Sequence, residues 1–135
     1  MNELTNSVKT LDKFGHGLLG IEAVFCEIHK AKVKMKLEER HMNAQGITHG
    51  GALFTLADTA AGLAFYTTGE KSVTLTTNMT YIGMSKIGET IFAEASLISS
   101  TNKFATYEVV VTGEDGRLLA TATNIMYKKA VKPKA

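Results

Sequence analysis

Residues 48–66 read THGGALFTLADTAAGLAFY, and this stretch constrains the architecture more than any other part of the 135-residue chain. Small and apolar side chains fill most of it, with a single charged residue, Asp58, near the middle. A helix that is hydrophobic nearly all round is buried nearly all round. The stretch therefore predicts one long central helix that the rest of the chain encloses.

The segments on both sides of this helix predict antiparallel strands. Residues 20–37 alternate between polar and apolar positions, most clearly in KAKVKMKLE (30–38), which has the period of a half-buried strand with lysines on its wet face. After Gly69, turn-forming sequences such as GEDG (113–116) separate four segments rich in β-branched and aromatic residues: SVTLTTNMTYI, TIFAEASLIS, FATYEVVVTG and RLLATATNIMY. Because a sheet can surround a helix only if it curls, we expect an α+β fold in which five or six antiparallel strands form a strongly curved sheet around the helix.

The two ends of the chain are expected to be peripheral to a single domain that spans residues 1–135. Leu4, Val8 and Leu11 recur at helical spacing within residues 2–14, and Gly15 is a stop signal. Residues 1–19 are therefore predicted to hold a short N-terminal helix. Residues 129–135 are basic and are predicted to form a flexible tail.

The composition excludes several classes of protein. An apolar content of 44% with 21% charged residues fits neither a disordered nor a membrane protein, and the net charge of +2 is too small to suggest nucleic-acid binding. The lone Cys26 cannot form an internal disulfide and suits a reducing compartment. Since the N-terminal residues also lack the apolar core of a signal peptide, we expect a cytoplasmic protein that binds no membrane.

Asp58 lies in a stripe of the predicted helix that is small and partly polar. Steps of three or four residues along the helix give Gly51, Thr55, Asp58 and Gly62. Small residues let a ligand or another backbone come close, and an unpaired carboxylate in apolar surroundings is costly. Two interpretations stay open here: a functional carboxylate, or one that threonines satisfy or that lies exposed at a groove.

The start of the helix carries a second signal, His49-Gly50-Gly51. Backbone N–H groups in a first turn lack helical partners, and glycine has no side chain to cover them, so a carbonyl oxygen could bind there as in an oxyanion hole. A glycine-rich tight turn is the alternative. Seven residues separate Gly51 from Asp58, about 10 Å along a helix, whereas a catalytic base must lie within about 3 Å of the atom it serves. For an enzyme we therefore expect a twofold dimer in which Asp58 of one chain faces Gly51 of the other.

The runs NAQGITHGGALFTLADTAAG (43–62) and TLTTNMTYIGMSKIGET (74–90) closely resemble the hotdog-fold thioesterases of the phenylacetic-acid-degradation type. The resemblance covers about residues 43–127. It implies the hotdog fold, a curved antiparallel sheet around a central helix, with chains paired into homodimers and often into tetramers. It also implies hydrolysis of acyl- or aryl-coenzyme A (CoA) thioesters to the free acid and CoA. CoA is then part of the substrate, and no separate cofactor is expected.

The resemblance also implies roles for individual residues. Asp58 would be the nucleophile or the general base, acting from the neighbouring subunit, and the Gly51 N–H would polarise the thioester carbonyl. Asn43 would help to position the nucleophile or the carbonyl, and His49 would orient groups at the helix start. Thr74 falls where the family often has a Ser or Thr that holds the attacking water.

Substrate contacts are expected on turns and beside the helix. Lys86, Asn102 and Lys103 lie on predicted turns where CoA could dock, although solvated turn residues are the alternative. An acyl or aryl group would enter an apolar pocket near Leu53, Phe54 and Leu56. The expected substrate-binding residues are Gly50, Leu53, Phe54, Lys86, Asn102 and Lys103.

The remaining chemistry-bearing residues receive no catalytic role. His16, His29 and His41 are expected to be ordinary surface or strand residues, and Cys26 to pack in the core or at an edge. No metal-ligand spacing or nucleotide-binding glycine loop is present in the sequence, so no metal is expected.

Two other functions stay open. One is a hotdog hydratase or dehydratase that recruits His49 and Asp58, and the other is a non-catalytic acyl-CoA-binding sensor or scaffold. Release of free thiol from acyl-CoA and aryl-CoA esters distinguishes hydrolysis from both.

Overall fold

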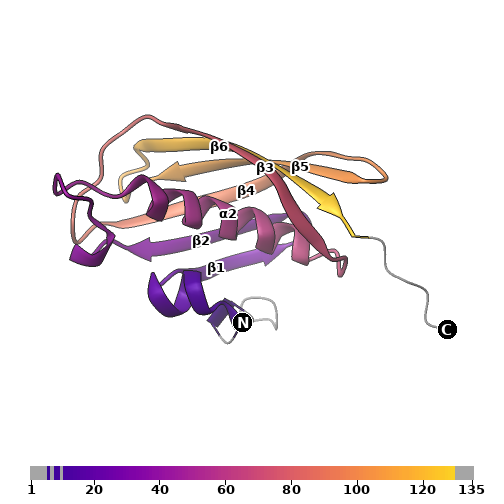
Figure 1. The fold of residues 1–135 in the computed structure, drawn as a ribbon, viewed down its shortest axis with the longest axis horizontal. Coiled ribbons are helices and arrows are strands. Elements are labelled where there is room, and N and C mark those ends of the chain that lie inside the picture. The colour runs from indigo at the N-terminus through magenta and orange to yellow at the C-terminus, as the bar shows by residue number, and fades with distance from the viewer. Residues whose placement is uncertain (1–5, 7, 10, 130–135) are drawn as a thin grey trace.

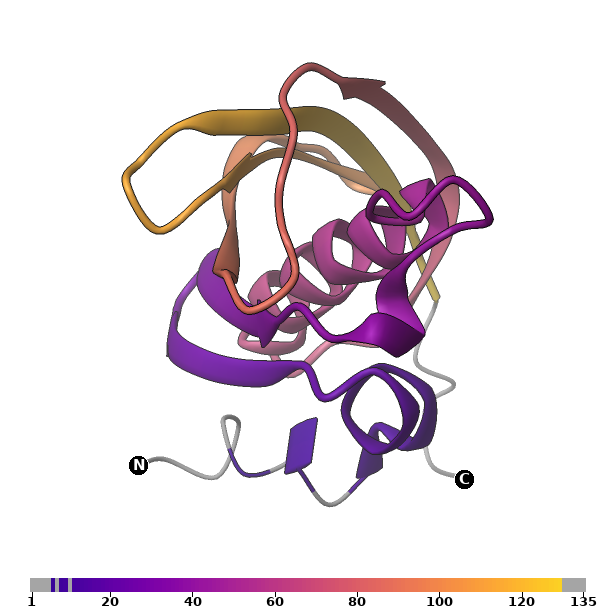
Figure 2. The same ribbon diagram turned by 90° about the vertical axis from the view of Figure 1, so that its left-hand side faces the viewer.

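The computed structural model describes residues 6, 8–9 and 11–129, which form one curved antiparallel sheet and one long helix (Figure 1). The elements are η1 (Lys13–Leu18), β1 (Glu22–Glu27), β2 (Lys30–Lys36), η2 (Glu39–His41), α2 (Gly50–Tyr66), β3 (Ser72–Tyr81), β4 (Thr90–Ser100), β5 (Phe104–Thr112) and β6 (Leu118–Lys128). The strand order is β1-β2-β4-β5-β6-β3, with every neighbouring pair antiparallel. Figure 2 shows the sheet curving around α2, so the predicted architecture is confirmed.

The core lies between α2 and the concave face of the sheet. The inner side of the helix is rich in alanine, and Ala57, Ala60 and Ala64 are buried together with Leu56. Small side chains allow the sheet to approach the helix closely, and full burial of a leucine such as Leu56 contributes about 1.5–3 kcal/mol. The hydrophobic run 48–66 thus becomes a helix packed against the curved sheet. It is not buried nearly all round as its composition predicts, because Gly51, Phe54 and Tyr66 are exposed.

The alternating stretch 20–37 is divided into β1 and β2 by a tight turn that alternation alone does not locate. His29 occupies this turn with φ 59°, and its N–H donates to Thr67 Oγ1 at 2.9 Å. In β2 the lysines lie outward while Ala31, Val33 and Met35 are buried, which confirms the predicted half-buried strand.

The N-terminal segment is helical at residues 6, 8–9 and 11, as predicted, but Gly15 is not where this helix ends. Asp12 interrupts it, and a separate π-helical turn, η1, follows from Lys13 to Leu18 and includes Gly15. Asp12 caps this turn by accepting a hydrogen bond from the Gly15 N–H at 2.9 Å, and a Cβ at position 15 would collide with the same carboxylate. Leu4 and the tail residues 130–135 lie outside the described residues.

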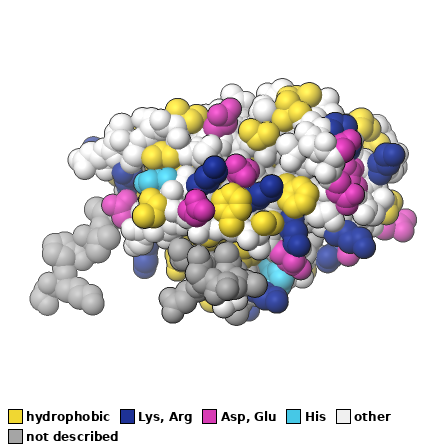
Figure 3. Space-filling view, turned by 180° about the vertical axis from the view of Figure 1, so that it is seen from behind, with side chains coloured by type: hydrophobic (Ala, Val, Ile, Leu, Met, Phe, Trp, Pro, Cys, Tyr) yellow, Lys and Arg dark blue, Asp and Glu magenta, His cyan; other side chains and the backbone are white. Residues whose placement is uncertain are grey.

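Charged side chains of both signs are interspersed on the face of the molecule shown in Figure 3. Among the described residues, no helix combines the length and apolarity required to span a membrane.

Candidate active site

Asp58 is held from the sheet side by two hydrogen bonds to a single carboxylate oxygen. Thr74, on β3, donates from its hydroxyl to Oδ1 at 3.2 Å, and Asn124, on β6, donates from Nδ2 to the same Oδ1 at 3.0 Å. Within the described part of the chain, Oδ2 has no hydrogen-bond partner. The two donors therefore orient the carboxylate and leave one oxygen for a water molecule or a substrate.

Asn124 is a site residue that the sequence analysis missed. Its side chain is fully buried, and its Nδ2 also donates to Thr77 Oγ1 at 3.1 Å. Its Oδ1 has no hydrogen-bond partner among the described residues. The sequence feature that could have identified Asn124 is its position in an alternating strand, where it shares the inward face with the apolar residues Ala122 and Met126. A buried polar group at such a position indicates a specific partner, which here is Asp58.

The start of α2 is built from His49 and the two glycines. The His49 ring caps the helix, because its Nδ1 accepts the Gly51 N–H at 2.9 Å. In this structure the expected oxyanion donor is therefore covered by an exposed, rotatable imidazole rather than open. Tyr81 OH donates to the Gly50 carbonyl at 3.0 Å, and a Cβ at position 50 would lie in tight contact with the tyrosine ring, at 3.3 Å.

Asn43 shapes the loop that leads into this helix. Its Oδ1 accepts from the backbone N–H groups of Gln45 and Ile47, at 2.9 and 3.2 Å. These are the bonds of an Asx turn, so within one chain the Asn43 side chain serves its own loop and not Asp58.

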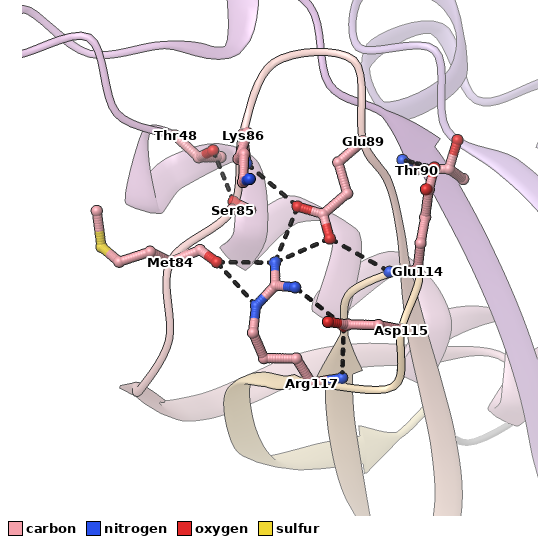
Figure 4. Close-up of polar contacts among 9 residues, drawn as sticks. All are labelled: Thr48, Met84, Ser85, Lys86, Glu89, Thr90, Glu114, Asp115 and Arg117. Atoms are coloured by element: carbon pink, nitrogen blue, oxygen red, sulfur yellow. Dashed lines mark hydrogen bonds and ion pairs between the residues drawn. The ribbon is translucent and has the colours of Figure 1, made fainter.

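The loop between β3 and β4 lies beside the helix start and is held by Arg117 (Figure 4). The guanidinium donates to both carboxylate oxygens of Glu89, at 2.9 and 2.8 Å, and to the Met84 carbonyl. Farther along the loop, Ser85 Oγ lies 2.8 Å from Thr48 Oγ1, next to the helix. Lys86, one of the expected CoA contacts, is therefore exposed on a fixed loop at the N-terminal end of α2.

Asn102 and Lys103 lie at the opposite end of the sheet from Lys86. The strand between them, β4, has 11 residues and so spans about 33 Å. One chain therefore does not bring the three expected CoA contacts together. The three residues expected to line one acyl pocket do not share one environment: Leu53 and Leu56 are buried in the core, whereas Phe54 is 39% exposed.

Two cavities open along the exposed stripe of α2. One, of about 390 Å³, has Asp58 and Gly62 in its wall together with the N-terminal residues Val8 and Leu11. The other, of about 400 Å³, lies at the helix start and is lined by His49, Gly51, Phe54 and Phe14, among others. Asp58 and Gly51 of one chain thus line different cavities.

His41 and Cys26, to which the sequence gives no catalytic role, are both buried within the fold. His41 is not a surface residue as expected: it is buried, its Nδ1 accepts the Glu38 N–H at 2.8 Å, and its Nε2 lies 2.8 Å from the Leu19 carbonyl. Cys26 is buried on β1, and this burial raises the pKa of its thiol. No group of three or more His, Cys, Asp or Glu in the described ranges is placed to hold a metal ion.

Comparison with known proteins identifies the family. Residues 45–120 match the model of the thioesterase superfamily. The chain belongs to this superfamily. A human protein named acyl-coenzyme A thioesterase 13 is 31% identical over 123 residues, which are 89% of this chain and 88% of that protein. A protein of Archaeoglobus fulgidus, provisionally named an esterase, is 36% identical over 98 residues, which are 73% of this chain and 64% of that protein.

Solved structures agree with this assignment. The TT0310 protein of Thermus thermophilus matches with a TM-score of 0.81 and 32% identity, over 84% of this chain and 96% of that chain. The smu.793 protein of Streptococcus mutans, solved bound to acetyl CoA, matches with a TM-score of 0.79 and 27% identity, over 83% of this chain and 90% of that chain. The thioesterase therefore has the hotdog fold that its sequence resembles, and its family makes it a thioester hydrolase.

Proposed function

We propose that this thioesterase hydrolyses acyl- or aryl-CoA thioesters, with Asp58 as the catalytic carboxylate. The observation that carries the proposal is the geometry of Asp58, which lines a cavity: Thr74 and Asn124 hold its Oδ1, and its Oδ2 has no hydrogen-bond partner among the described residues. The names of the human relative and of the acetyl-CoA-bound neighbour support CoA thioesters as the substrate class. The reaction needs no cofactor, since CoA is part of the substrate, and the lone Cys26 suits a reducing compartment such as the cytoplasm.

The reaction joins a water oxygen to the acyl carbon and breaks the C–S bond. As general base, Asp58 takes a proton from the water as it attacks, the carbonyl oxygen gains negative charge near a backbone N–H, and the departing CoA thiolate then receives a proton. As nucleophile, Asp58 would instead form an anhydride that water opens to the same two products. Turnover in ¹⁸O-labelled water tests the second route, because label found in Asp58 would establish the anhydride.

The catalytic site is proposed to be shared between two chains. Asp58 and Gly51 of one chain are about 10 Å apart along α2 and line separate cavities, so one chain does not present both groups to one carbonyl. The strand that carries Thr74, β3, is an edge of the sheet. An unpaired edge can join a second copy across a twofold axis, which would bring each Asp58 toward the helix start of the other chain. Rotation of the His49 ring would then release the Gly51 N–H to the thioester carbonyl.

Complementation between two inactive variants tests this scheme. Asp58→Asn removes the carboxylate, and Gly51→Pro removes the backbone donor at a first-turn position where proline is tolerated. Each variant alone is expected to be inactive, whereas co-expressed chains form mixed dimers that hold one intact site, made from Asp58 of one chain and Gly51 of the other. If both groups acted within one chain, the mixture would stay inactive.

The alternative functions predict different results in the same assay. A non-catalytic acyl-CoA-binding protein would bind the thioester without thiol release. A hydratase or dehydratase would change the acyl chain and leave the thioester bond intact. Either outcome would refute hydrolysis as the activity.

A further inference from the structure

The cavity next to Asp58 is lined mainly by apolar side chains, and one lining residue has no side chain. Val8 and Leu11, from the N-terminal segment, and Leu63, from α2, contribute apolar surface, and Asp58 lies in the same wall. Asp12, which also lines the cavity, is engaged elsewhere, because it accepts the Gly15 N–H. At about 390 Å³ the cavity is near the lower end of the range for small-molecule sites.

Gly62 is the lining residue without a side chain. It follows Asp58 by four residues, so it lies on the same helical face, about 6 Å farther along the axis. A Cβ built at Gly62 meets no atom within 4 Å, so this position opens into space rather than against packed neighbours. Packing of the helix against the sheet therefore does not require glycine here.

We propose that this cavity receives the acyl group of the thioester and that Gly62 determines how long an acyl chain it admits. The inference rests on the proposed hydrolysis of acyl-CoA esters. With the reacting carbonyl at Asp58, an apolar chain would pass over Gly62 along α2, between the helix and the wall formed by Val8 and Leu11. A side chain at position 62 would occupy that path.

The test is a graded series at one position, Gly62→Ala, Gly62→Val and Gly62→Leu, assayed against straight-chain acyl-CoA esters of increasing length. One methylene in a hydrophobic pocket is worth roughly 10–200-fold in kcat/KM. The Leu variant is therefore expected to lose at least about tenfold in kcat/KM for the longest good substrate, with the shortest nearly unaffected and Ala and Val between them. A uniform loss at all lengths, or an unchanged length profile, would overturn the assignment of Gly62.

A second pair of variants tests the side of the cavity formed by the N-terminal segment, this time by enlarging the cavity instead of filling it. Leu11→Ala widens the cavity and should shift the preference toward longer or bulkier acyl groups. Leu18→Ala is the matched control, because Leu18 is also an exposed leucine of the N-terminal region but does not line this cavity. Equal effects of the two variants would contradict the inference.

Two further readouts separate the possible failures. If the unmodified protein hydrolyses no acyl-CoA ester, the proposed function itself is wrong. If it hydrolyses them but Gly62→Leu weakens dimer formation in sedimentation experiments and leaves the length profile unchanged, the cavity belongs to a subunit interface and the acyl-group inference is wrong.

Discussion

Asn124 Nδ2 lies 3.0 Å from Asp58 Oδ1, although 66 positions separate the two residues in the chain. The contact joins the last strand, β6, to the middle of α2. Thr74, on β3, donates a second hydrogen bond to the same oxygen. Because both donors come from the sheet, the orientation of the carboxylate depends on how α2 is seated in the fold.

Asp58→Asn should abolish most of the hydrolysis while the fold persists. The amide oxygen can still accept the bonds from Thr74 and Asn124, but the amide can neither take a proton nor attack a carbonyl. A general base contributes about 10²–10⁴-fold, and a loss in kcat of that size is expected. Thiol release measures the rate and circular dichroism checks the fold; a variant with nearly full activity would remove Asp58 from the mechanism.

Asn124→Leu should lower kcat and leave KM nearly unchanged. The substitution keeps the number and branching of the side-chain heavy atoms but removes the donor that orients Asp58, and a misplaced catalytic group can cost up to about 10²-fold. Thr77→Val is the control, because it removes the Asn124–Thr77 bond without touching the carboxylate. If Thr77→Val and Asn124→Leu reduced kcat equally, Asn124 would have a packing role rather than a positioning one.

Glu89→Gln should destabilise the protein at neutral pH and have less effect in acid. Burial by itself would raise the pKa of Glu89, but hydrogen bonds from Arg117 and from the backbone of Lys86 and Glu114 hold it below the usual value. A lowered pKa means that the stabilisation is fully present above the unfolded-state value of about 4.3 and is lost as the pH falls through the folded-state pKa.

Chemical denaturation of the Glu89→Gln variant at pH 7 and at successively lower pH measures this difference. Glu108→Gln, on the exposed side of β5, is the control and should leave the free energy of unfolding unchanged at every pH. A Glu89→Gln deficit that stayed constant into strong acid would rule out the ion pair as its cause.

Gly62→Ala should stabilise the fold, whereas Gly88→Ala should destabilise it. Neither site has an atom within 4 Å of the added Cβ, but Gly62 is helical and Gly88 has φ +91°. Alanine in a helix is favoured over glycine by about 0.5–1 kcal/mol, while a positive φ strains any residue with a side chain. Thermal unfolding of the two variants checks the opposite signs, and a destabilising Gly62→Ala would mean that the helix is tightly packed at this position.

The long helix and the lysine-faced strand were predictable because each is encoded by local periodicity. The helix begins at Gly50 and ends at Tyr66, within two residues of the expected run, and the inward residues of β2 are the apolar ones. The family resemblance also singled out Thr74, as the residue that holds the attacking water. That role stays a prediction, and in the structure the Thr74 hydroxyl lies 3.2 Å from Asp58 Oδ1. Local pattern and family resemblance together therefore indicated the fold and named Asp58 and Thr74 as candidate site residues.

Contacts between distant segments were not predictable in the same way. Asn124 looks like one polar residue in a strand until the register of β3 with β6 places it beside Thr77. His41 looks like a surface residue in a charged segment, yet it is buried, and its ring nitrogens contact the Glu38 N–H at the start of η2 and the Leu19 carbonyl at the end of η1. Lys86 and Asn102 lie far apart because the 11-residue strand β4 runs between them, and the sequence motifs do not give the length of that strand.

The anchoring of Asp58 from the strands has a practical consequence for engineering. Thr74 and Asn124 hold the carboxylate from the strands, whereas Gly62 lies beside the cavity and contacts neither donor. Substitution at Gly62 can therefore alter which molecules enter while the reacting oxygen keeps its place. Substrate preference and turnover are thus separable traits in this scaffold, to be optimised in successive rounds of selection.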